Sequence, residues 1–465
     1  MRKVHLITFG CQMNKLDSEL AAEALADAGH ILVADEAEAD LVIVNACSVR
    51  EHAERRVLSR LARFRGRRES ENGFRLGLMG CFAERDGEAL LAALPYLDFA
   101  VGTRQFFRLP EIVDRLEDGD CGLVLLSGGT ESGPGVGKAG PRRRHRGIQA
   151  FVSVMRGCDN RCSYCVVPDV RGGEISRPPV EAAAEVRSLA LAGAREITLL
   201  GQNIDAYGRK DGWSLAGLLR LIDAEVPDET GLVRLRFVTS HPRDVTRELA
   251  GAVDSIPRVA RHFHMPAQSG SDRVLFRMRR GYDRAAYEER LAMLRKEVPG
   301  SAVASDFIVG FPGETERDFL DTVNLVETAG FQNIYVFKYS PRPGTPAARD
   351  FADDVPDEEK RRRNRTLLAV QERIGLECGR RLIGTRQLVL AEGPSPRDPD
   401  RWIGRTGENR VCVFPSPPSG EDWRGCLVLL KVESATHLTL FCRPAHDGSG
   451  EAAKAVPNEE DESWL

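Results

Sequence analysis

A closely spaced run of three cysteines constrains this chain more than any other feature. Cys158, Cys162 and Cys165 follow the spacing C-x3-C-x2-C, and no fourth cysteine lies nearby. Three thiolates on one short loop can hold three irons of a [4Fe–4S] cluster, which usually has four thiolate ligands. The spacing therefore predicts a cluster with one iron open to a small ligand. Such a cluster is suited to catalysis, whereas a fully ligated one only carries electrons.

Two other uses of these cysteines stay open. A structural zinc site would need a second pair of ligands at matching spacing. A redox-active C-x-x-C pair would leave Cys158 without a role. We therefore prefer the cluster to zinc binding, and both to buried or redox-active thiols.

Residues 1–126 alternate short apolar runs with segments of helical periodicity. Strands are predicted at 6–9, 41–44 and 75–79, and the apolar residues between 16 and 28 recur at helical spacing before Gly29. The continuous apolar run at 41–44 is typical of a strand buried on both faces of a sheet. We therefore predict a doubly wound α/β domain over residues 1–126.

A cysteine follows each of these three predicted strands. Cys11, Cys47 and Cys81 stand just beyond the strand ends. Because sites in open parallel sheets form beyond the carboxyl ends of the strands, these thiols could meet and hold a second cluster. Free cysteine is also a common buried residue, so three separate core positions are the alternative. Agreement at all three strands favours a cluster.

The strand–helix alternation resumes at Ile148 and predicts a central domain over 148–379. Polar motifs follow its expected strands, as at the active face of a parallel barrel, although turn formation would explain any one of them as well. His262 and His264 are interpreted as packing residues. The alternation predicts a complete or partial (βα)6 barrel with strands at 149–155, 196–200, 232–238, 262–265, 302–309 and 333–338.

The remaining segments differ in composition. Residues 127–147 are rich in Gly, Ser, Pro and Arg and are predicted to be a linker. After a charged helix, residues 380–443 predict a small OB-like β-barrel. Residues 444–465 are acidic and poor in apolar side chains, which predicts disorder. The barrel strands are expected at 387–392, 410–414, 426–432 and 436–442, and five cysteines outside the triplets are expected to be buried: Cys121, Cys378, Cys412, Cys426 and Cys442.

Bulk properties limit the function further. No apolar run reaches the roughly 18 residues of a membrane span, and 11 cysteines without an export signal favour the reducing cytoplasm. The formal net charge is −4, but residues 447–465 carry −5, which leaves the body at +1. Three basic runs, at 142–146, 277–280 and 360–365, are more often solvated faces than nucleic-acid contacts.

Several motifs together resemble the methylthiotransferase family of the radical S-adenosylmethionine (SAM) superfamily. Tyr164 between the last two cysteines matches the superfamily signature, and residues 380–443 resemble the RNA-binding TRAM domain. Asp169-Val170 departs from the Tyr-Thr that relatives often carry. The other motifs that are similar to the family are Phe9-Gly10-Cys11-Gln12-Met13-Asn14, Asn45-Ala46-Cys47-Ser48, Gly80-Cys81, Phe237-Val238-Thr239-Ser240-His241-Pro242, Gln268-Ser269-Gly270-Ser271, Val309-Gly310-Phe311-Pro312-Gly313-Glu314 and Tyr339-Ser340-Pro341-Arg342-Pro343-Gly344-Thr345-Pro346-Ala347.

The resemblance implies a reaction and its cofactors. One SAM would bind the open iron at Cys158, Cys162 and Cys165 and yield a 5′-deoxyadenosyl radical, which removes hydrogen from C2 of N6-dimethylallyladenosine next to the anticodon in tRNA. A second [4Fe–4S] cluster on the upstream cysteines would present sulfur methylated by a second SAM. No catalytic residue is predicted beyond the cluster ligands. The SAM contacts implied are Gln202, Asn203, Gln268, Ser269 and Asp306.

The resemblance also implies partners and leaves alternatives. The partners would be tRNA and an electron donor such as flavodoxin or ferredoxin. No association with a membrane is expected, and the enzyme would be a cytoplasmic monomer. A related enzyme could act instead on N6-threonylcarbamoyladenosine in tRNA or on a ribosomal protein aspartate. An RNA-binding iron–sulfur protein without catalysis is the alternative of a different class. An aryl C–H bond cannot be broken by side-chain acids or bases, which favours the cofactor chemistry.

Overall fold

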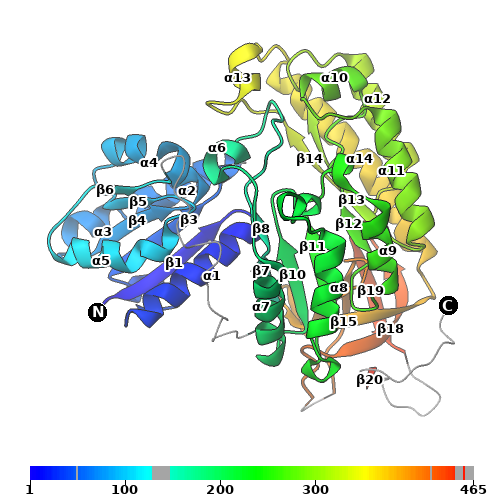
Figure 1. Cartoon of the computed structure of the whole chain (residues 1–465), viewed down its shortest axis with the longest axis horizontal. Helices are drawn as coiled ribbons and strands as arrows, with labels where there is room; N and C mark the ends of the chain where they lie inside the picture. Colours follow the sequence, from blue (N-terminus) through cyan, green and yellow to red (C-terminus); the bar gives the residue numbers. More distant parts are fainter. Residues whose placement is uncertain (49–50, 128–146, 419–420, 446–453, 456–465) are drawn as a thin grey trace.

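The computed structural model shows three structural units along the chain. The N-terminal sheet lies beside the central barrel, and the C-terminal strands lie behind and below that barrel (Figure 1). No helix within the described residues has both the length and the apolar character of a membrane span. The structure describes residues 1–48, 51–127, 147–418, 421–445 and 454–455.

The N-terminal unit is a parallel six-stranded sheet with the order β2-β1-β3-β4-β5-β6. Apolar side chains of β3 alternate between two cores: Leu41 and Ile43 face one, and Val42 and Val44 face the other. The strands are β1 (Lys3–Phe9), β2 (Ile31–Leu32), β3 (Leu41–Ala46), β4 (Arg75–Met79), β5 (Phe99–Val101) and β6 (Leu123–Leu125).

Helices cover both faces of this sheet. Residues of α1 and α5 pack in the first core, and residues of α2 and α4 pack in the second. The doubly wound prediction is therefore confirmed. The helices are α1 (Gln12–Asp27), α2 (Glu51–Arg63), α3 (Arg65–Ser70), α4 (Cys81–Ala93) and α5 (Leu109–Glu117).

The central unit is a partial barrel made of two parallel sheets. Their orders are β11-β10-β7 and β12-β13-β14, and they meet where Leu235 forms an isolated parallel bridge with Val259. The predicted partial barrel is confirmed. Its strands are β7 (Gln149–Ser153), β10 (Glu196–Leu200), β11 (Arg234–Val238), β12 (His262–His264), β13 (Ala302–Val309) and β14 (Asn333–Lys338), and a separate antiparallel pair consists of β8 (Met155–Arg156) and β9 (Ile175–Ser176).

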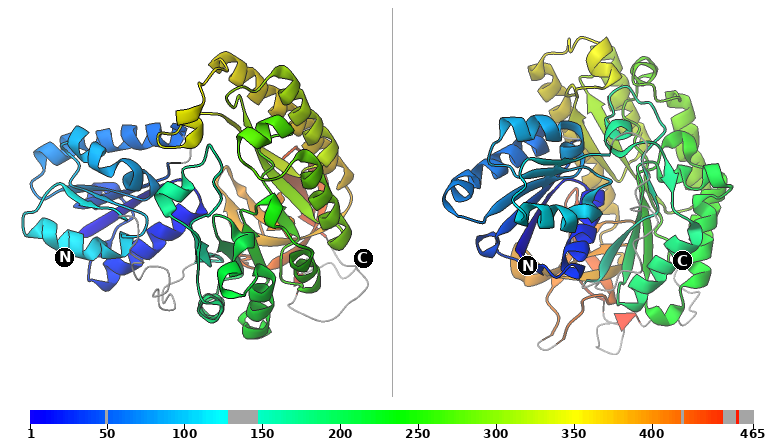
Figure 2. Two further views of the ribbon diagram at one scale, coloured as in Figure 1. Left: turned by 45° about the horizontal axis from the view of Figure 1, so that its top comes forward. Right: turned by 60° about the vertical axis from the view of Figure 1, so that its left-hand side comes forward.

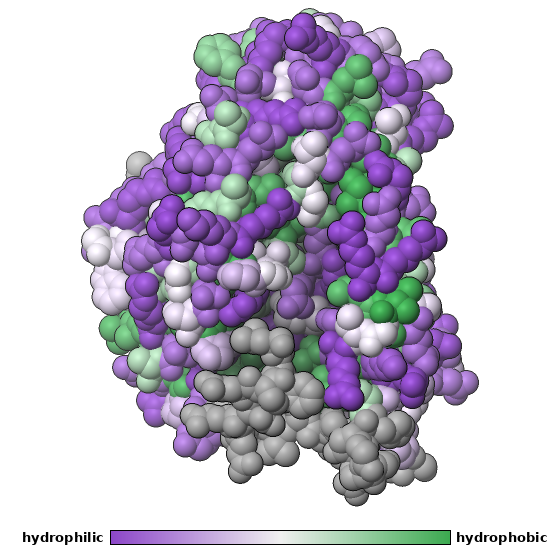
Figure 3. Space-filling model, turned by 90° about the vertical axis from the view of Figure 1, so that its right-hand side faces the viewer, coloured by the Kyte–Doolittle hydropathy of each residue, from purple (hydrophilic) through white to green (hydrophobic). Residues whose placement is uncertain are grey.

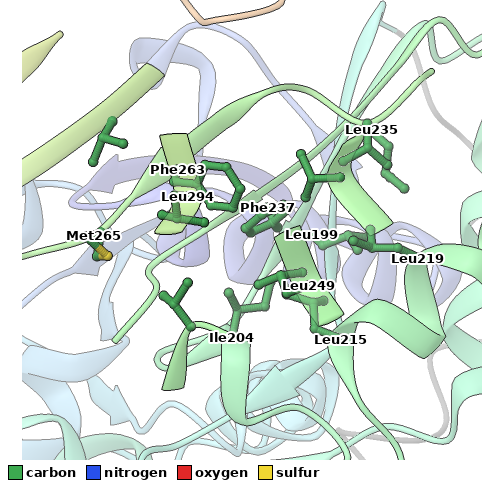
Figure 4. Packing of buried hydrophobic residues seen from close by; sticks show 14 of the residues in the cluster. Leu199, Ile204, Leu215, Leu219, Leu235, Phe237, Leu249, Phe263, Met265 and Leu294 are labelled. Atoms are coloured by element: carbon green, nitrogen blue, oxygen red, sulfur yellow. The ribbon is translucent and has the colours of Figure 1, made fainter. Parts of the chain in front are cut away.

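One large apolar core joins these strands to the helices outside them. Phe237 and Phe263 pack edge to face, with ring centroids 5.6 Å apart, and leucines from α8, α9 and α11 surround them (Figure 4). This core holds the strand ends rigidly. The helices are α6 (Val167–Arg171), α7 (Pro179–Leu191), α8 (Leu215–Glu225), α9 (Arg247–Ser255), α10 (Asp272–Arg277), α11 (Arg284–Glu297), α12 (Glu316–Ala329), α13 (Pro346–Asp350) and α14 (Asp357–Arg381).

The C-terminal unit is a small closed β-barrel. Its strands pair in the order β15-β16-β17-β19-β18, and β18 closes back on β15. The barrel docks on the central unit through Arg236, which donates hydrogen bonds to the carbonyl oxygens of Thr406 and Gly407. The small-barrel prediction is confirmed. The strands are β15 (Arg386–Ser395), β16 (Asp398–Thr406), β17 (Val411–Pro415), β18 (Leu427–Ala435), β19 (Thr439–Pro444) and β20 (Lys454–Ala455).

Three details differ from the sequence predictions. Strand β16 was not predicted. Of the five cysteines predicted to be buried, Cys412 and Cys442 are buried and Cys378 and Cys426 are half-buried, whereas Cys121 is exposed because it lies in the turn that precedes β6. Lys454–Ala455, within the segment predicted to be disordered, pairs with Leu427 and Val428, where β19 leaves the edge of β18 uncovered. Most of the predicted linker (128–146) and the rest of the tail (446–453 and 456–465) lie outside the described residues.

The outer surface of the barrel side is mainly hydrophilic, with small separate apolar areas (Figure 3). The basic run 360–365 is only partly a solvated face. Lys360 is 4% exposed and pairs with Asp353, and Arg363 is 4% exposed and pairs with Glu314. These two side chains fix α14 to the barrel. The basic run 142–146 lies outside the described residues.

Candidate active site

The first cysteine triplet forms at the carboxyl edge of the N-terminal sheet. β1, β3 and β4 are neighbours, and Cys11, Cys47 and Cys81 follow their ends. Cys11 and Cys47 flank the point between β1 and β3 where the strand order reverses, which is where sites form in open α/β sheets. A Cβ on Gly10 would lie 2.7 Å from the Cβ of Cys47, so only glycine permits this close approach.

The three thiols differ in environment. Cys11 is exposed, and the hydrogen bond with Cys47, with a further contribution from Arg171, lowers its pKa to about 6. Cys47 and Cys81 are 4% and 3% exposed, and burial raises the pKa of Cys81. Arg171 opposes that effect by donating a hydrogen bond from Nε to the Cys81 sulfur at 3.3 Å. The site is therefore a mostly buried set of sulfurs beside a cation.

A network of buried amides supports these strand ends. The Asn14 side chain donates to Asn45 Oδ1 at 2.9 Å, and Asn45 Nδ2 donates to Asn14 O at 2.8 Å and to Ser18 Oγ at 2.9 Å. Because fully satisfied buried polar networks rigidify their surroundings, Asn14 and Asn45 fix α1 against β3. Cys11 directly precedes α1 and Cys47 directly follows β3, so the network also holds these two cysteines in place.

The second triplet lies on a loop whose base is closed by the β8–β9 pair. The loop requires Gly157, with φ +77°, because a Cβ there would lie 2.0 Å from the carbonyl oxygen of Gly173. The Gly157 N–H donates to Gln202 Oε1 at 2.5 Å, and the Cys158 N–H donates to Gly172 O at 3.0 Å. The first bond attaches the cysteine loop to the end of β10, and the second attaches it to the end of α6.

One buried arginine contacts the second triplet as well. Arg280, 5% exposed, donates from Nη1 to the Cys162 sulfur and to the Tyr164 hydroxyl, both at 3.3 Å. The interpretation of the basic run 277–280 as a solvated face is therefore wrong for Arg280. Its burial depends on Tyr282 and the carbonyl of Pro266, which lie outside that run.

Both triplets fit the cationic core of an iron–sulfur cluster, to which the cysteines would bind as thiolates. Burial raises the pKa of Cys158 to about 11 and that of Cys165 to about 12. Thiols in such surroundings ionise only with a cation beside them, and a bound metal supplies that charge. The described residues contain no group of three or more His, Cys, Asp or Glu side chains arranged to hold a single metal ion.

Helix α6 connects the second triplet to the first. It begins two residues after Cys165 and lies between the N-terminal sheet and the barrel (Figures 1 and 2). Val166 and Val170 pack against Cys81, and the Thr103 hydroxyl donates to Val170 O at 2.6 Å. The segment from Val166 to Val170 therefore contacts Cys81 of the first triplet and directly follows Cys165 of the second.

The predicted SAM-contact residues gather at the carboxyl ends of the barrel strands, with different partners. Asn203 Oδ1 and Gln268 Oε1 are buried and have no hydrogen-bond partner among the described residues. Gln268 adopts a left-handed φ of 70°, a conformation that is costly outside glycine. The other three are already engaged: Gln202 by Gly157, Ser269 by Thr322 at 3.3 Å, and Asp306 by His264 at 2.9 Å.

Two further polar groups lie at this end: Asp205, which the sequence did not single out, and His241, which belongs to a predicted motif but was not predicted as a SAM contact. Asp205 Oδ2 and His241 Nε2 are also buried without a partner among the described residues. Burial raises the pKa of Asp205 to about 7, and burial with the nearby Arg280 lowers that of His241 to about 2. Four unpartnered buried atoms at one barrel end indicate a site for a polar ligand such as SAM, because buried polar groups normally find partners.

A partial (βα)6 barrel with this cysteine loop at its end defines a radical SAM protein. The Radical SAM superfamily model matches residues 152–326, and the model of Uncharacterized protein family UPF0004 matches residues 3–102. The solved structure of the radical SAM methyltransferase TsrM from Kitasatospora setae, with cobalamin and a [4Fe–4S] cluster bound, has a TM-score of 0.55 at 16% identity over 75% of this chain and 74% of that chain. This likeness concerns the fold alone.

Curated relatives cover nearly the whole chain. The tRNA-2-methylthio-N(6)-dimethylallyladenosine synthase of Geobacter sulfurreducens is 46% identical over 90% of this chain and 92% of its own length. The synthases of Moorella thermoacetica (42%; 89% and 92%) and Chlorobium luteolum (40%; 94% and 96%) are similar to a comparable extent. The chain belongs to the family of tRNA-2-methylthio-N6-dimethylallyladenosine synthases.

Proposed function

We propose that this chain is a tRNA methylthiotransferase that acts on C2 of N6-dimethylallyladenosine next to the anticodon. The observation that carries the proposal is that α6 directly follows the second cysteine triplet and packs against Cys81 of the first. Its two [4Fe–4S] clusters and SAM supply a 5′-deoxyadenosyl radical, a sulfur atom and, from a second SAM, a methyl group. One site then removes hydrogen, and the other delivers the methylthio group.

The cysteines have separate roles in this proposal. Cys158, Cys162 and Cys165 hold three irons of the radical-forming cluster and leave one iron open for SAM. Cys11, Cys47 and Cys81 hold the second cluster. The exposure of Cys11 leaves that site accessible from solvent.

The barrel end binds SAM and positions the base. Asn203 Oδ1 and Gln268 Oε1 are free acceptors for amino or ribose hydroxyl groups. The proposed set of contacts also includes Gln202, Ser269 and Asp306. Hydrogen bonds hold these three side chains in place: Gln202 to Gly157, Ser269 to Thr322 and Asp306 to His264. The adenine must leave its stack in the anticodon loop to reach this buried end, because a stacked base does not expose C2 to an enclosed site.

The proposal extends to partners, location and domain limits. All eleven cysteines are free in the structure, which supports a reducing compartment; we place the enzyme in the cytoplasm as a monomer that receives electrons from flavodoxin or ferredoxin. The proposed domains are 1–126, a linker at 127–147, a radical SAM domain at 148–379, a TRAM domain at 380–443 and a tail at 444–465.

The test is anaerobic reconstitution with iron and sulfide, followed by incubation with SAM, dithionite and tRNA that carries N6-dimethylallyladenosine. We expect 5′-deoxyadenosine and the 2-methylthio nucleoside, both measured by mass spectrometry after digestion. If neither product forms while the protein holds iron, the proposed function is wrong. A parallel reaction with tRNA that carries N6-threonylcarbamoyladenosine identifies the substrate, because only the true substrate gives a methylthio product.

A further inference from the structure

A buried ion network connects the two cysteine triplets. Asp17 of α1, 1% exposed, accepts from Arg171 Nη2 at 2.8 Å and from Arg156 Nη2 at 3.1 Å. Arg156 lies two residues before Cys158, and Arg171 lies six residues after Cys165. One carboxylate therefore holds both ends of the segment that contains the second triplet, while Arg171 touches the sulfur of Cys81 in the first.

The network has more positive than negative charge. Two guanidinium groups, 6% and 5% exposed, share one carboxylate. A buried charge without a counter-charge is costly, so this arrangement favours an anionic group at the neighbouring thiols. A [4Fe–4S] core with three thiolates is anionic, and one-electron reduction makes it more so. The excess positive charge therefore lies beside Cys81, where a bound cluster would place negative charge.

Arg171 also has a donor that the protein does not use. Its Nε donates to the Cys81 sulfur at 3.3 Å and its Nη2 to Asp17, but its buried Nη1 has no partner among the described residues. Buried N–H groups are rarely left unpaired. Because Nη1 belongs to the same planar group that contacts Cys81, it is available to a further anionic atom of whatever the thiols hold.

We propose that Arg171 is a positioning residue that sets the reduction potential of the N-terminal cluster. This inference rests on the proposed cluster sites. Hydrogen bonds to cluster sulfurs and nearby positive charge both stabilise the reduced form, and therefore raise the potential. Arg280 makes the equivalent contact with Cys162 at 3.3 Å, so each cluster has its own arginine and the two potentials are set separately.

The experiment isolates one cluster at a time in the full-length chain. In the parent with Cys158, Cys162 and Cys165 all changed to Ala, only the N-terminal cluster assembles. Its midpoint potential is measured by dithionite titration with mediators, followed by electron paramagnetic resonance. We expect Arg171→Met to shift the potential to a more negative value at unchanged iron content. Arg171→Lys keeps the charge but loses the planar set of donors, so its shift has the same sign and is smaller.

Arg280→Met is the matched control, because it removes an equally buried guanidinium from the other triplet. It should leave the N-terminal potential unchanged and should shift the potential of the second cluster in a parent with Cys11, Cys47 and Cys81 changed to Ala.

The inference is overturned if the Arg171→Met potential equals that of its parent, if Arg280→Met shifts the N-terminal potential equally, or if both Arg171 variants lose their iron. A parent that binds no iron would instead overturn the cluster assignment itself, and the inference with it. None of these measurements needs tRNA. A failure of this inference can therefore be told apart from a failure of the proposed function, which would appear as the absence of methylthio product.

Discussion

At the scale of residues, Cys11 differs from the other five thiols of the two triplets in being exposed to solvent. Cys11 is exposed and its pKa is about 6, whereas Cys158 and Cys165 have pKa values raised by burial to about 11 and 12. A radical must be kept from solvent, which suits the triplet that has no exposed thiol. A sulfur that is delivered and then replaced needs an approach, which suits the triplet that includes Cys11.

Changing Cys11 to Ala separates the two roles. The variant should retain formation of 5′-deoxyadenosine from SAM while methylthio product falls below detection, because only the N-terminal cluster loses a ligand. Cys162→Ala should abolish both products. Cys121→Ala is the control: that thiol is exposed and lies outside both triplets, so its activity should equal that of the unmodified chain. Loss of SAM cleavage in Cys11→Ala would show that the upstream cysteines serve folding instead.

Gly157 and Gly300 form a matched pair for testing the cysteine loop. Their φ angles are +77° and +75°, so alanine at either position costs about 1–2 kcal/mol of backbone strain. Only at Gly157 would the new Cβ also meet backbone, 2.0 Å from Gly173 O, whereas at Gly300 there is nothing within 4 Å. We expect Gly157→Ala to bind less iron than Gly300→Ala. Equal iron content per chain in the two variants would refute the role of this close contact.

At the scale of elements, α1 and α6 join domains that the chain separates by the segment 127–147. Asp17 on α1 and Arg171 on α6 form an ion pair with both side chains almost fully buried. Removal of one partner from such a pair leaves an uncompensated charge and is strongly destabilising. The carboxylate of Asp17 is therefore the charged part of a contact between the two domains that also includes the packing of Val166 and Val170 against Cys81.

Asp17→Asn should lower the free energy of unfolding by about 3–5 kcal/mol, because two buried guanidinium groups lose the carboxylate that they share. Glu69→Gln is the comparison. Its ion pair with Arg65 joins two exposed side chains, so the change should leave the free energy of unfolding nearly unchanged. Urea denaturation of both proteins without iron measures the difference. A loss of under 1 kcal/mol for Asp17→Asn would mean that water or a relaxed loop replaces the carboxylate.

The sequence predicted those elements whose pattern is local. Parallel strands buried on both faces are continuous apolar runs, so β3 was evident, as was the cysteine after it. Strand β16 was not, because Asp398-Pro399-Asp400 at its start is typical of a turn and only the pairing with β15 and β17 makes it a strand. Arg171 and Arg280 were missed for a related reason. Arginine is usually exposed, and only tertiary partners distant in sequence reveal that these two contact sulfur.

At the scale of the whole molecule, charge is distributed unevenly for a protein that acts on RNA. The formal net charge is −4, yet Glu459, Glu460, Asp461 and Glu462 stand at the very end of the chain, outside the described residues. The rest of the protein presents many arginines, some of which are neutralised within the fold, such as Arg363 by Glu314. The acidic end therefore opposes attraction of a polyanion by the body.

Deletion of residues 456–465 raises the formal net charge from −4 to 0. We expect tRNA to bind more tightly at low ionic strength, by about tenfold or less, because a few exposed charges change the long-range field without adding contacts. The gain should vanish at about 1 M salt, where the Debye length is only about 3 Å. A full-length variant with Glu459, Glu460 and Glu462 changed to Gln and Asp461 to Asn should reproduce the effect. If the deletion changes Kd and the neutralised variant does not, charge is not the cause and the segment itself competes for the RNA surface.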